Sequence, residues 1–351
     1  MFNKPCGISD ESYAQDSALV RTKYRWTLLI LLFVLMFGFF PLMASDYILD
    51  VAINIAITAI AVLGLQIITG FAGQMSIGHA ALMAVGAYVS GMLSLHYGLS
   101  FWITMPIAAL SSGMIGIMVG IPALRIRGFY IAVTTLAAHH IIMWCILHGD
   151  KYTNAISGLS TEEVGIGNFL FDNEFKFYYL AMAFLVIIVF LTNNMMRSRV
   201  GRAMLAVRDN DLAAEFMGIN IFRSKLTAFF LSSIYAGIAG ALLAHYQGII
   251  SVEQFTLMDS VWMIGMIIIG GPTITGAIMG VVFLKVLAIM VLFLAPWFGS
   301  LVPAFAASAV SGFMQMFFGA VIILFLIFEP RGLAHRWQIF LSTFRLWPFP
   351  Y

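Results

Sequence analysis

The chain has 351 residues, of which 62% are hydrophobic and 10% are charged, and its formal net charge is +2. Soluble domains are about 45 to 50% apolar and about 25% charged, so this composition excludes an ordinary soluble globular protein. A net charge this small gives no reason to expect nucleic acid as a partner. The two cysteines, Cys6 and Cys145, lie in a polar tail and in an apolar run, and they predict no disulfide framework.

Apolar runs long enough to cross a hydrocarbon core of about 30 Å recur along most of the chain. The polar segment ahead of Trp26 lacks the early apolar stretch and the cleavage site of a signal peptide, so we expect the first run to be an anchor. Ten candidate spans follow: 26–43, 47–68, 76–95, 101–124, 129–147, 177–191, 226–246, 261–269, 276–294 and 310–328. The eighth is short, and a count of eight to eleven stays open. The predicted fold class is an all-α polytopic membrane protein with broken or re-entrant glycine-rich segments.

The positions of Lys and Arg predict the orientation, because basic loops are retained in the cytoplasm. With the amino terminus inside, the ten-span arrangement leaves Lys151 and Lys176 outside and puts most other basic residues inside: Arg125, Arg127, Arg197, Arg199, Arg202, Arg208, Arg223, Lys225, Arg331, Arg336 and Arg345. Both termini are therefore expected in the cytoplasm. The predicted division is a polar tail at 1–25, a transmembrane region at 26–333 with a cytoplasmic loop at 193–225, and a tail at 334–351.

A glycine-rich segment separates the second and third spans. Residues 70–80 read Gly-Phe-Ala-Gly-Gln-Met-Ser-Ile-Gly-His-Ala. Glycine costs about 1 kcal/mol against alanine in a helix interior, and irregular backbone at membrane depth survives only inside protein or beside water. Either the small residues serve close helix packing, or the helix is broken beside a transport pathway. The polar neighbours Gln74, Ser76 and His79 favour the pathway.

A second glycine break, Gly-Gly-Pro-Thr-Ile-Thr-Gly, occupies residues 270–276. Two interrupted apolar segments in corresponding halves point to a transport site, so Thr273 and Thr275 are further pathway candidates. Lys285 follows about two and a half turns after this break, too deep to reach the membrane surface easily. We expect no acidic residue near the midplane, because Asp50 and Asp259 fall near the outer ends of their spans.

The cytoplasmic loop at 193–225 contains a predicted amphipathic helix from Met204 to Met217. Gly218 provides its left-handed stop. Such a helix can lie on the lipid surface, but its mixed charges suit the docking of a cytoplasmic partner better. The candidate contact residues are Arg208, Asp211, Leu212, Ala213, Ala214 and Gly218.

Several enzyme motifs are absent from the sequence. It contains no Walker-type phosphate loop, no metal-ligand spacing of the His-Glu-x-x-His kind and no nucleophile elbow. We therefore expect no cofactor, no metal, and no hydrolysis of ATP by the chain itself.

Five segments together resemble the permease subunits, of the M type, of branched-chain amino acid ABC importers: 70–81, 125–130, 201–220, 236–241 and 329–333. The resemblance implies a multi-pass protein of the bacterial inner membrane that moves small amino acids of the branched-chain kind by alternating access. It also implies its partners, which are a second homologous permease, two cytoplasmic ATP-binding subunits and a soluble substrate-binding protein.

The chain departs from the family pattern at two places. ABC importers dock their ATPases on a Glu-Ala-Ala-x-x-x-Gly pattern, whereas residues 212–218 read Leu-Ala-Ala-Glu-Phe-Met-Gly. The second break lacks the middle glycine of the usual Gly-Gly-x-Gly-Thr. The docking role carries over from the resemblance, and the electrostatic detail does not.

Three alternative functions make different demands on the sequence. Similar permeases carry urea and short amides. An ion-coupled secondary carrier working alone usually needs buried carboxylates or broken-helix carbonyls to hold its ion, and the expected lack of midplane acids counts against it. In a membrane scaffold that transports nothing, the glycine breaks would have no purpose.

Overall fold

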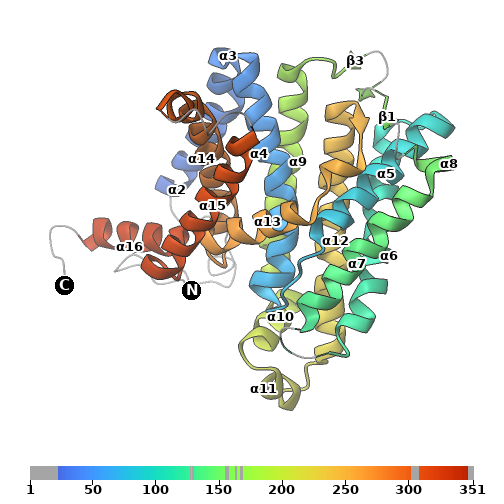
Figure 1. Cartoon of the computed structure of the whole chain (residues 1–351). Helices are drawn as coiled ribbons and strands as arrows, with labels where there is room; N and C mark the ends of the chain where they lie inside the picture. Colours follow the sequence, from blue (N-terminus) through green and yellow to red (C-terminus); the bar gives the residue numbers. More distant parts are fainter. Residues whose placement is uncertain are drawn as a thin grey trace.

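The computed structural model describes residues 23–126, 128, 130–154, 158–162, 164–166, 169–301 and 308–346. These residues form a helical bundle (Figure 1). The predicted tail up to residue 22, Arg127 and the last five residues of the chain lie outside the described residues.

The helices are, in chain order, α2 (Lys23–Val34), η1 (Leu35–Phe39), α3 (Phe40–Met43), α4 (Asp46–Gln66), η2 (Ile67–Phe71), α5 (His79–Tyr97), α6 (Phe101–Ala123), α7 (Tyr130–His148), α8 (Asp150–Thr153), α9 (Glu174–Arg197), α10 (Arg199–Asp209), α11 (Asp211–Phe216), α12 (Ile221–Gln247), η3 (Val252–Gln254), α13 (Leu257–Gly270), α14 (Ile274–Leu301), α15 (Ser308–Phe328) and α16 (Leu333–Leu346). Elements η1 and η2 are π-helical, and η3 is a 3₁₀ turn. Two short antiparallel pairs join β1 (Leu159–Ser160) to β4 (Ile249–Ile250) and β2 (Gly165–Ile166) to β3 (Phe169–Leu170).

Nine helical stretches of the described chain are long and apolar enough to cross a membrane, and the bent pair α15 and α16 is a candidate tenth. The prediction of an all-α polytopic membrane protein is therefore confirmed. The short eighth span is α13, whose 14 residues rise about 21 Å, less than a hydrocarbon core of about 30 Å. It becomes long enough only together with its approach from Val252.

Helices α5 and α12 pack against each other at glycines in the centre of the bundle. A Cβ on Gly86 would lie 2.4 Å from the carbonyl oxygen of Gly237, and one on Gly240 would lie 2.0 Å from that of Met83. The Ser112 hydroxyl adds a bond from α6 to the Leu82 carbonyl at 2.8 Å. At Gly86, close packing accounts for the small residue, as is usual where helices associate in lipid.

We expect Gly86→Val to destabilise the protein by about 1 to 3 kcal/mol, because its side chain would overpack the contact with α12. Thermal melting of the purified protein in detergent measures the loss. The matched control is Gly319→Val on α15, where an added Cβ meets nothing within 4 Å. Equal melting temperatures for the two variants would contradict a tight α5–α12 contact.

Candidate functional site

The first glycine break is a change of helix type followed by a loop. Helix α4 ends in the π-helical turn η2, irregular backbone occupies 72–78, and α5 starts at His79. Two backbone bonds close the turn, from the Ala72 amide to the Ile67 carbonyl and from the Gln74 amide to the Ile68 carbonyl. Gly73 has a φ of 66°, which L side chains rarely adopt. Such π turns are frequent at functional sites.

The three polar residues of this break are buried. Gln74, Ser76 and His79 are exposed by 4%, 3% and 0%. The Nε2 atom of His79 lies 2.9 Å from the Ala61 carbonyl oxygen, so this ring ties α5 to α4. Ser76 borders a void of about 10 Å³ beside Thr135, roughly enough for one water molecule. In this conformation the three side chains line no open channel among the described residues.

The second break forms the start of α14. The Thr273 hydroxyl accepts a bond from the Gly276 amide at 3.0 Å, and Thr275 is exposed. Gly270 meets Gly276 so closely that a Cβ on it would lie 2.0 Å from the Gly276 carbonyl oxygen. The structure does not bring the two threonines to the first break, because α13 lies between. Its eleven residues from Ser260 to Gly270 rise about 15 Å.

The start of α13 meets the start of α5 instead. The Ala80 amide donates to the Ser260 hydroxyl at 2.9 Å, and Thr256 and Asp259 cap α13 reciprocally. Asp259 therefore lies beside the first turn of α5, in the middle of the bundle where Figure 1 shows α13. The expectation that it lies near an outer end is wrong. The residues before Asp259 form a 3₁₀ turn and extended backbone instead of a helix. A span predicted as a helix therefore did not place Asp259 inside the bundle.

The cytoplasmic loop holds two helices where one was predicted. Asn210 is extended, with φ of −159° and ψ of 110°, and its side chain accepts a bond from the Ala213 amide. Asparagine is a strong N-cap residue, so it ends α10 and starts α11. The prediction of a single helix over 204–217 is wrong for this reason. Helix α11 is the lowest element in Figure 1.

Helix α11 leaves an apolar surface uncovered. Phe216 is 91% exposed, Met217 83% and Leu212 67%, whereas Ala214 is 3% exposed and packs inward. Asp211 pairs with Lys225 at 2.7 Å, which ties α11 to α12. We call Leu212, Phe216 and Met217 the α11 surface.

The Arg208 side chain contacts the first glycine break. Its Nη1 donates to the Gly70 carbonyl at 2.9 Å, and its Nε and Nη2 donate to the Asp209 carboxylate. A Cβ on Gly73 would lie 2.9 Å from the Arg208 Cγ. A cation at the C-terminal end of a helix is also favoured by the helix dipole. This link was not predicted, and the sequence contains no pairing signal for two residues 138 positions apart.

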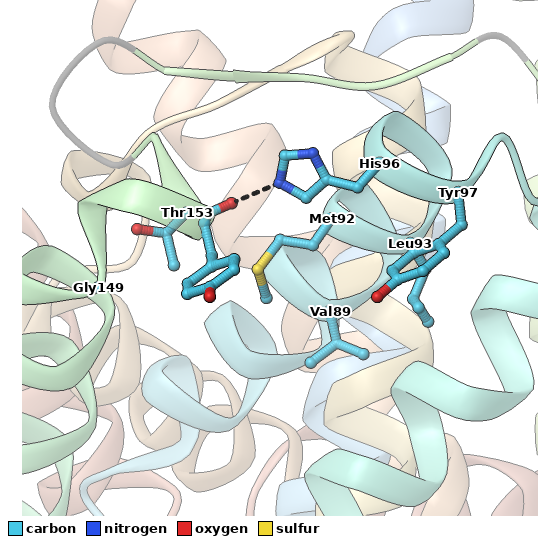
Figure 2. A pocket seen from close by; sticks show the side chains of 8 residues that line it. Val89, Met92, Leu93, His96, Tyr97, Gly149 and Thr153 are labelled. Carbon is cyan, nitrogen blue, oxygen red and sulfur yellow. Dashed lines mark hydrogen bonds between the residues drawn. The ribbon is translucent and has the colours of Figure 1, made fainter.

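A cavity of about 630 Å³ opens at the upper end of the bundle, between the end of α5 and α8 (Figure 2). Its walls include Met92, Leu93 and Tyr97, and the His96 ring lies 3.1 Å from the Tyr152 carbonyl oxygen. Between β3 and α9, the Lys176 ammonium hydrogen-bonds to the Asp172 carboxylate and lowers the pKa of that carboxyl group. None of the predicted pathway residues borders this cavity. The described residues contain no cluster that could hold a metal ion.

Residues 47–326 match the family model of the branched-chain amino acid transport system permease component. No solved structure matches the chain significantly.

Three curated relatives span different degrees of similarity. The high-affinity branched-chain amino acid transport system permease protein LivM of Salmonella typhimurium is 31% identical, over 84% of this chain and 71% of its own length. LivM of Escherichia coli is 30% identical, over 91% and 76%. The guanosine ABC transporter permease protein NupQ of Bacillus subtilis is 24% identical, over 49% and 59%. The chain therefore belongs to the family of branched-chain amino acid transport system permease components of ABC importers.

Proposed function

We propose that this permease subunit forms the membrane pathway of a branched-chain amino acid importer together with a second homologous permease. Two ATP-binding subunits drive it from the cytoplasm, and a soluble binding protein delivers the substrate. The observation that carries the proposal is the link from the α11 surface through Arg208 to the Gly70 break. It connects a candidate docking surface to the broken helix inside the membrane.

The α11 surface is the proposed contact with an ATP-binding subunit. Covering these three large apolar side chains with a partner would stabilise the complex by about 25 cal/mol per Å² of buried apolar area. Asp211, Ala213 and Gly218 stay candidates beside them. Ala214 is buried and packs beneath α11. Arg208 lies on α10 and is not part of the α11 surface.

Transmission is proposed to run from α11 to α10 and then to η2. Asn210 joins the two helices directly, so a displacement of α11 moves Arg208. The Gly70 carbonyl accepts the Arg208 bond, and the irregular segment with Gln74 and Ser76 follows within a few residues. The proposed pathway residues become accessible in another conformation. They are Gln74, Ser76, His79, Thr273 and Thr275.

The proposed substrates are amino acids with aliphatic side chains. The LivM relatives are named for branched-chain amino acid transport, and a mostly apolar passage suits an aliphatic side chain better than a solute with many hydroxyls. The name of the guanosine permease makes a nucleoside a competitor, and urea is another. An ion-coupled carrier would work without ATP.

The proposed orientation puts the α11 end and both termini in the cytoplasm, as the basic loops require. The predicted divisions at 1–25, 26–333 and 334–351 follow from it. The β1–β4 end then faces the binding protein.

Transmission through Arg208 can be tested by removing its side chain. We expect Arg208→Ala to leave the ATP-binding subunits attached but to uncouple ATP hydrolysis from transport, because the bond to Gly70 is lost. Uptake into proteoliposomes should fall about tenfold or more, the effect of losing one charged hydrogen bond of about 1.5 to 3 kcal/mol. Co-purification of the ATP-binding subunits and hydrolysis are measured on the same sample.

Two comparison variants separate transmission from docking. Arg202→Ala, on the same helix, removes a bond only to the nearby Arg197 carbonyl and should transport normally. Phe216→Asp should lose the ATP-binding subunits themselves. If Arg208→Ala couples hydrolysis to uptake as well as Arg202→Ala does, Arg208 has no role in transmission.

The orientation is tested by thiol labelling in intact cells. With the native cysteines replaced by serine, Ser100→Cys at the exposed start of α6 should react with an impermeant reagent. Glu215→Cys, exposed on α11, should react only after permeabilisation. We avoid Asn154 because its φ of 43° disfavours most replacements. The reverse labelling pattern would refute the orientation.

The proposed function is tested by uptake of labelled leucine, urea and guanosine. The complex is reconstituted with its own binding protein, and ATP is supplied on the side of the ATP-binding subunits. We expect leucine uptake that requires ATP. ATP-dependent uptake of urea or guanosine without leucine, or leucine uptake that follows an ion gradient without ATP, would overturn the assignment.

A further inference from the structure

Helix α16 leaves the bundle with much of its apolar face uncovered. Leu333, Trp337, Phe340 and Leu341 follow the i, i+4, i+7, i+8 spacing of one helix face. Leu333 packs against the core, whereas Trp337 is 51% exposed and Phe340 is 59% exposed. The two exposed rings stack, with their centroids 5.7 Å apart. More than half of each ring residue therefore stays uncovered by the described chain, and the functions argued above make no use of this face.

Polar and basic residues occupy other sides of α16 and the segment around it. Arg336 and Gln338 are exposed. From Pro330 to Tyr351 the sequence contains three arginines and no acidic residue, and the Glu329 carboxylate just before is paired with Arg336. A helix with aromatic residues on one face and basic residues on another is of the kind that lies in the plane of a membrane interface. Tryptophan is enriched at that depth.

A membrane helix leads directly into α16. Helix α15 has 21 residues, none of them charged, and it rises about 31 Å, enough to cross a hydrocarbon core of about 30 Å by itself. Its last turn carries exposed apolar side chains, with Leu326 at 49%, Ile327 at 67% and Phe328 at 74%. Lipid-facing apolar residues therefore continue to the point where α16 begins.

The direction and length of α16 prevent it from being a further span. It is bent by 45° from α15, and Figure 1 shows it in red, running out from the side of the bundle across the direction of α9. Its 14 residues rise about 21 Å, less than the hydrocarbon core. The helix starts at the edge of the membrane and stays close to it.

The turn before α16 packs against the second glycine break. A Cβ on Gly332 would lie 2.5 Å from the Gly271 amide nitrogen, and a Cβ on Gly271 would lie 2.7 Å from the Arg331 carbonyl oxygen. Gly271 and Gly332 have φ values of 97° and 77°, which other residues rarely adopt. The two backbones are in contact without side chains between them, so a displacement of α16 displaces the break.

We infer that α16 lies in the headgroup region of a bilayer that contains anionic lipid, and that this contact holds the second glycine break in place. Trp337 and Phe340 insert among the upper acyl chains, and Arg331 and Arg336 bind lipid phosphates. This role goes beyond the proposed transport function, because it concerns the lipid and not the substrate.

A protein subunit that covers the Trp337 and Phe340 face is the competing explanation. We favour lipid because the exposed apolar residues of α15 continue up to α16. The charge of the segment also favours lipid, because arginines without acidic residues beside them are attracted to anionic headgroups.

The lipid contact is tested by fluorescence quenching in the complete complex, reconstituted with phosphatidylethanolamine and phosphatidylglycerol. The native cysteines are replaced by serine, and Phe340→Cys and Gln338→Cys carry the same dye. Gln338 is the matched control, because residues two apart on a helix do not share a face. Brominated lipid should quench the dye at position 340 several-fold more than at position 338. The difference should shrink when phosphatidylcholine replaces phosphatidylglycerol.

Three outcomes of the quenching experiment overturn the inference. The first is equal quenching at the two positions. The second is a difference that phosphatidylcholine leaves unchanged, because the arginines then bind no anionic lipid. The third is a dye at position 340 that neither brominated lipid nor aqueous iodide reaches, because a protein subunit then covers this face.

The hold on the second break is tested by uptake. Trp337→Asp should lower ATP-dependent uptake several-fold in complexes of normal subunit composition, whereas Gln338→Asp, on another side of α16, should not. Equal uptake by the two variants overturns the role of α16 in holding the break. The quenching measurement needs no transport, so failure of the proposed function and failure of this inference are distinguishable.

Discussion

Lipid offers no hydrogen bonds to the backbone, and this constraint governs every interruption of the helices in this protein. Three interruptions show how it is met. At the π turn η2 the freed Gly70 carbonyl receives the Arg208 guanidinium. At the start of α5 the Ala80 amide, which no helical carbonyl can satisfy, donates to Ser260. At the first π turn, η1, the carbonyls of Met36 and Phe37 accept bonds from two tyrosine hydroxyls of α9.

Each of these bonds joins segments far apart in the sequence, so an interruption also becomes a connection. The first glycine break is held by α10 on the side of α11 and by α13 from the middle of the bundle. A movement of either helix must therefore disturb the broken segment. Close glycine contacts between α5 and α12 leave little space for one helix to shift against the other. The proposed coupling of the α11 surface to a membrane pathway rests on these connections.

The buried polar side chains of the bundle also need hydrogen-bond partners, because lipid offers none. In the first break the His79 Nε2 atom bonds to the Ala61 carbonyl oxygen, whereas His79 Nδ1 and Gln74 Oε1 are buried without a hydrogen-bond partner. A protein that must release its substrate gains from such groups, since they bind a ligand without being consumed by structure. The polar atoms of the first break thus divide into those that hold the broken segment and those without a partner.

The sequence by itself determined the class of fold, the family and the places where helices are interrupted, because hydrophobic length and glycine content act locally. It predicted one docking helix over 204–217 in the polar loop, and it assigned no role to Lys285. Only the tertiary structure decided that Asn210 splits the loop helix, that Arg208 reaches Gly70, that α13 separates the threonines from the first break, and that Asp259 lies inside the bundle. Each of these depends on contacts between residues distant in the chain, and hydrophobic periodicity carries no record of such contacts.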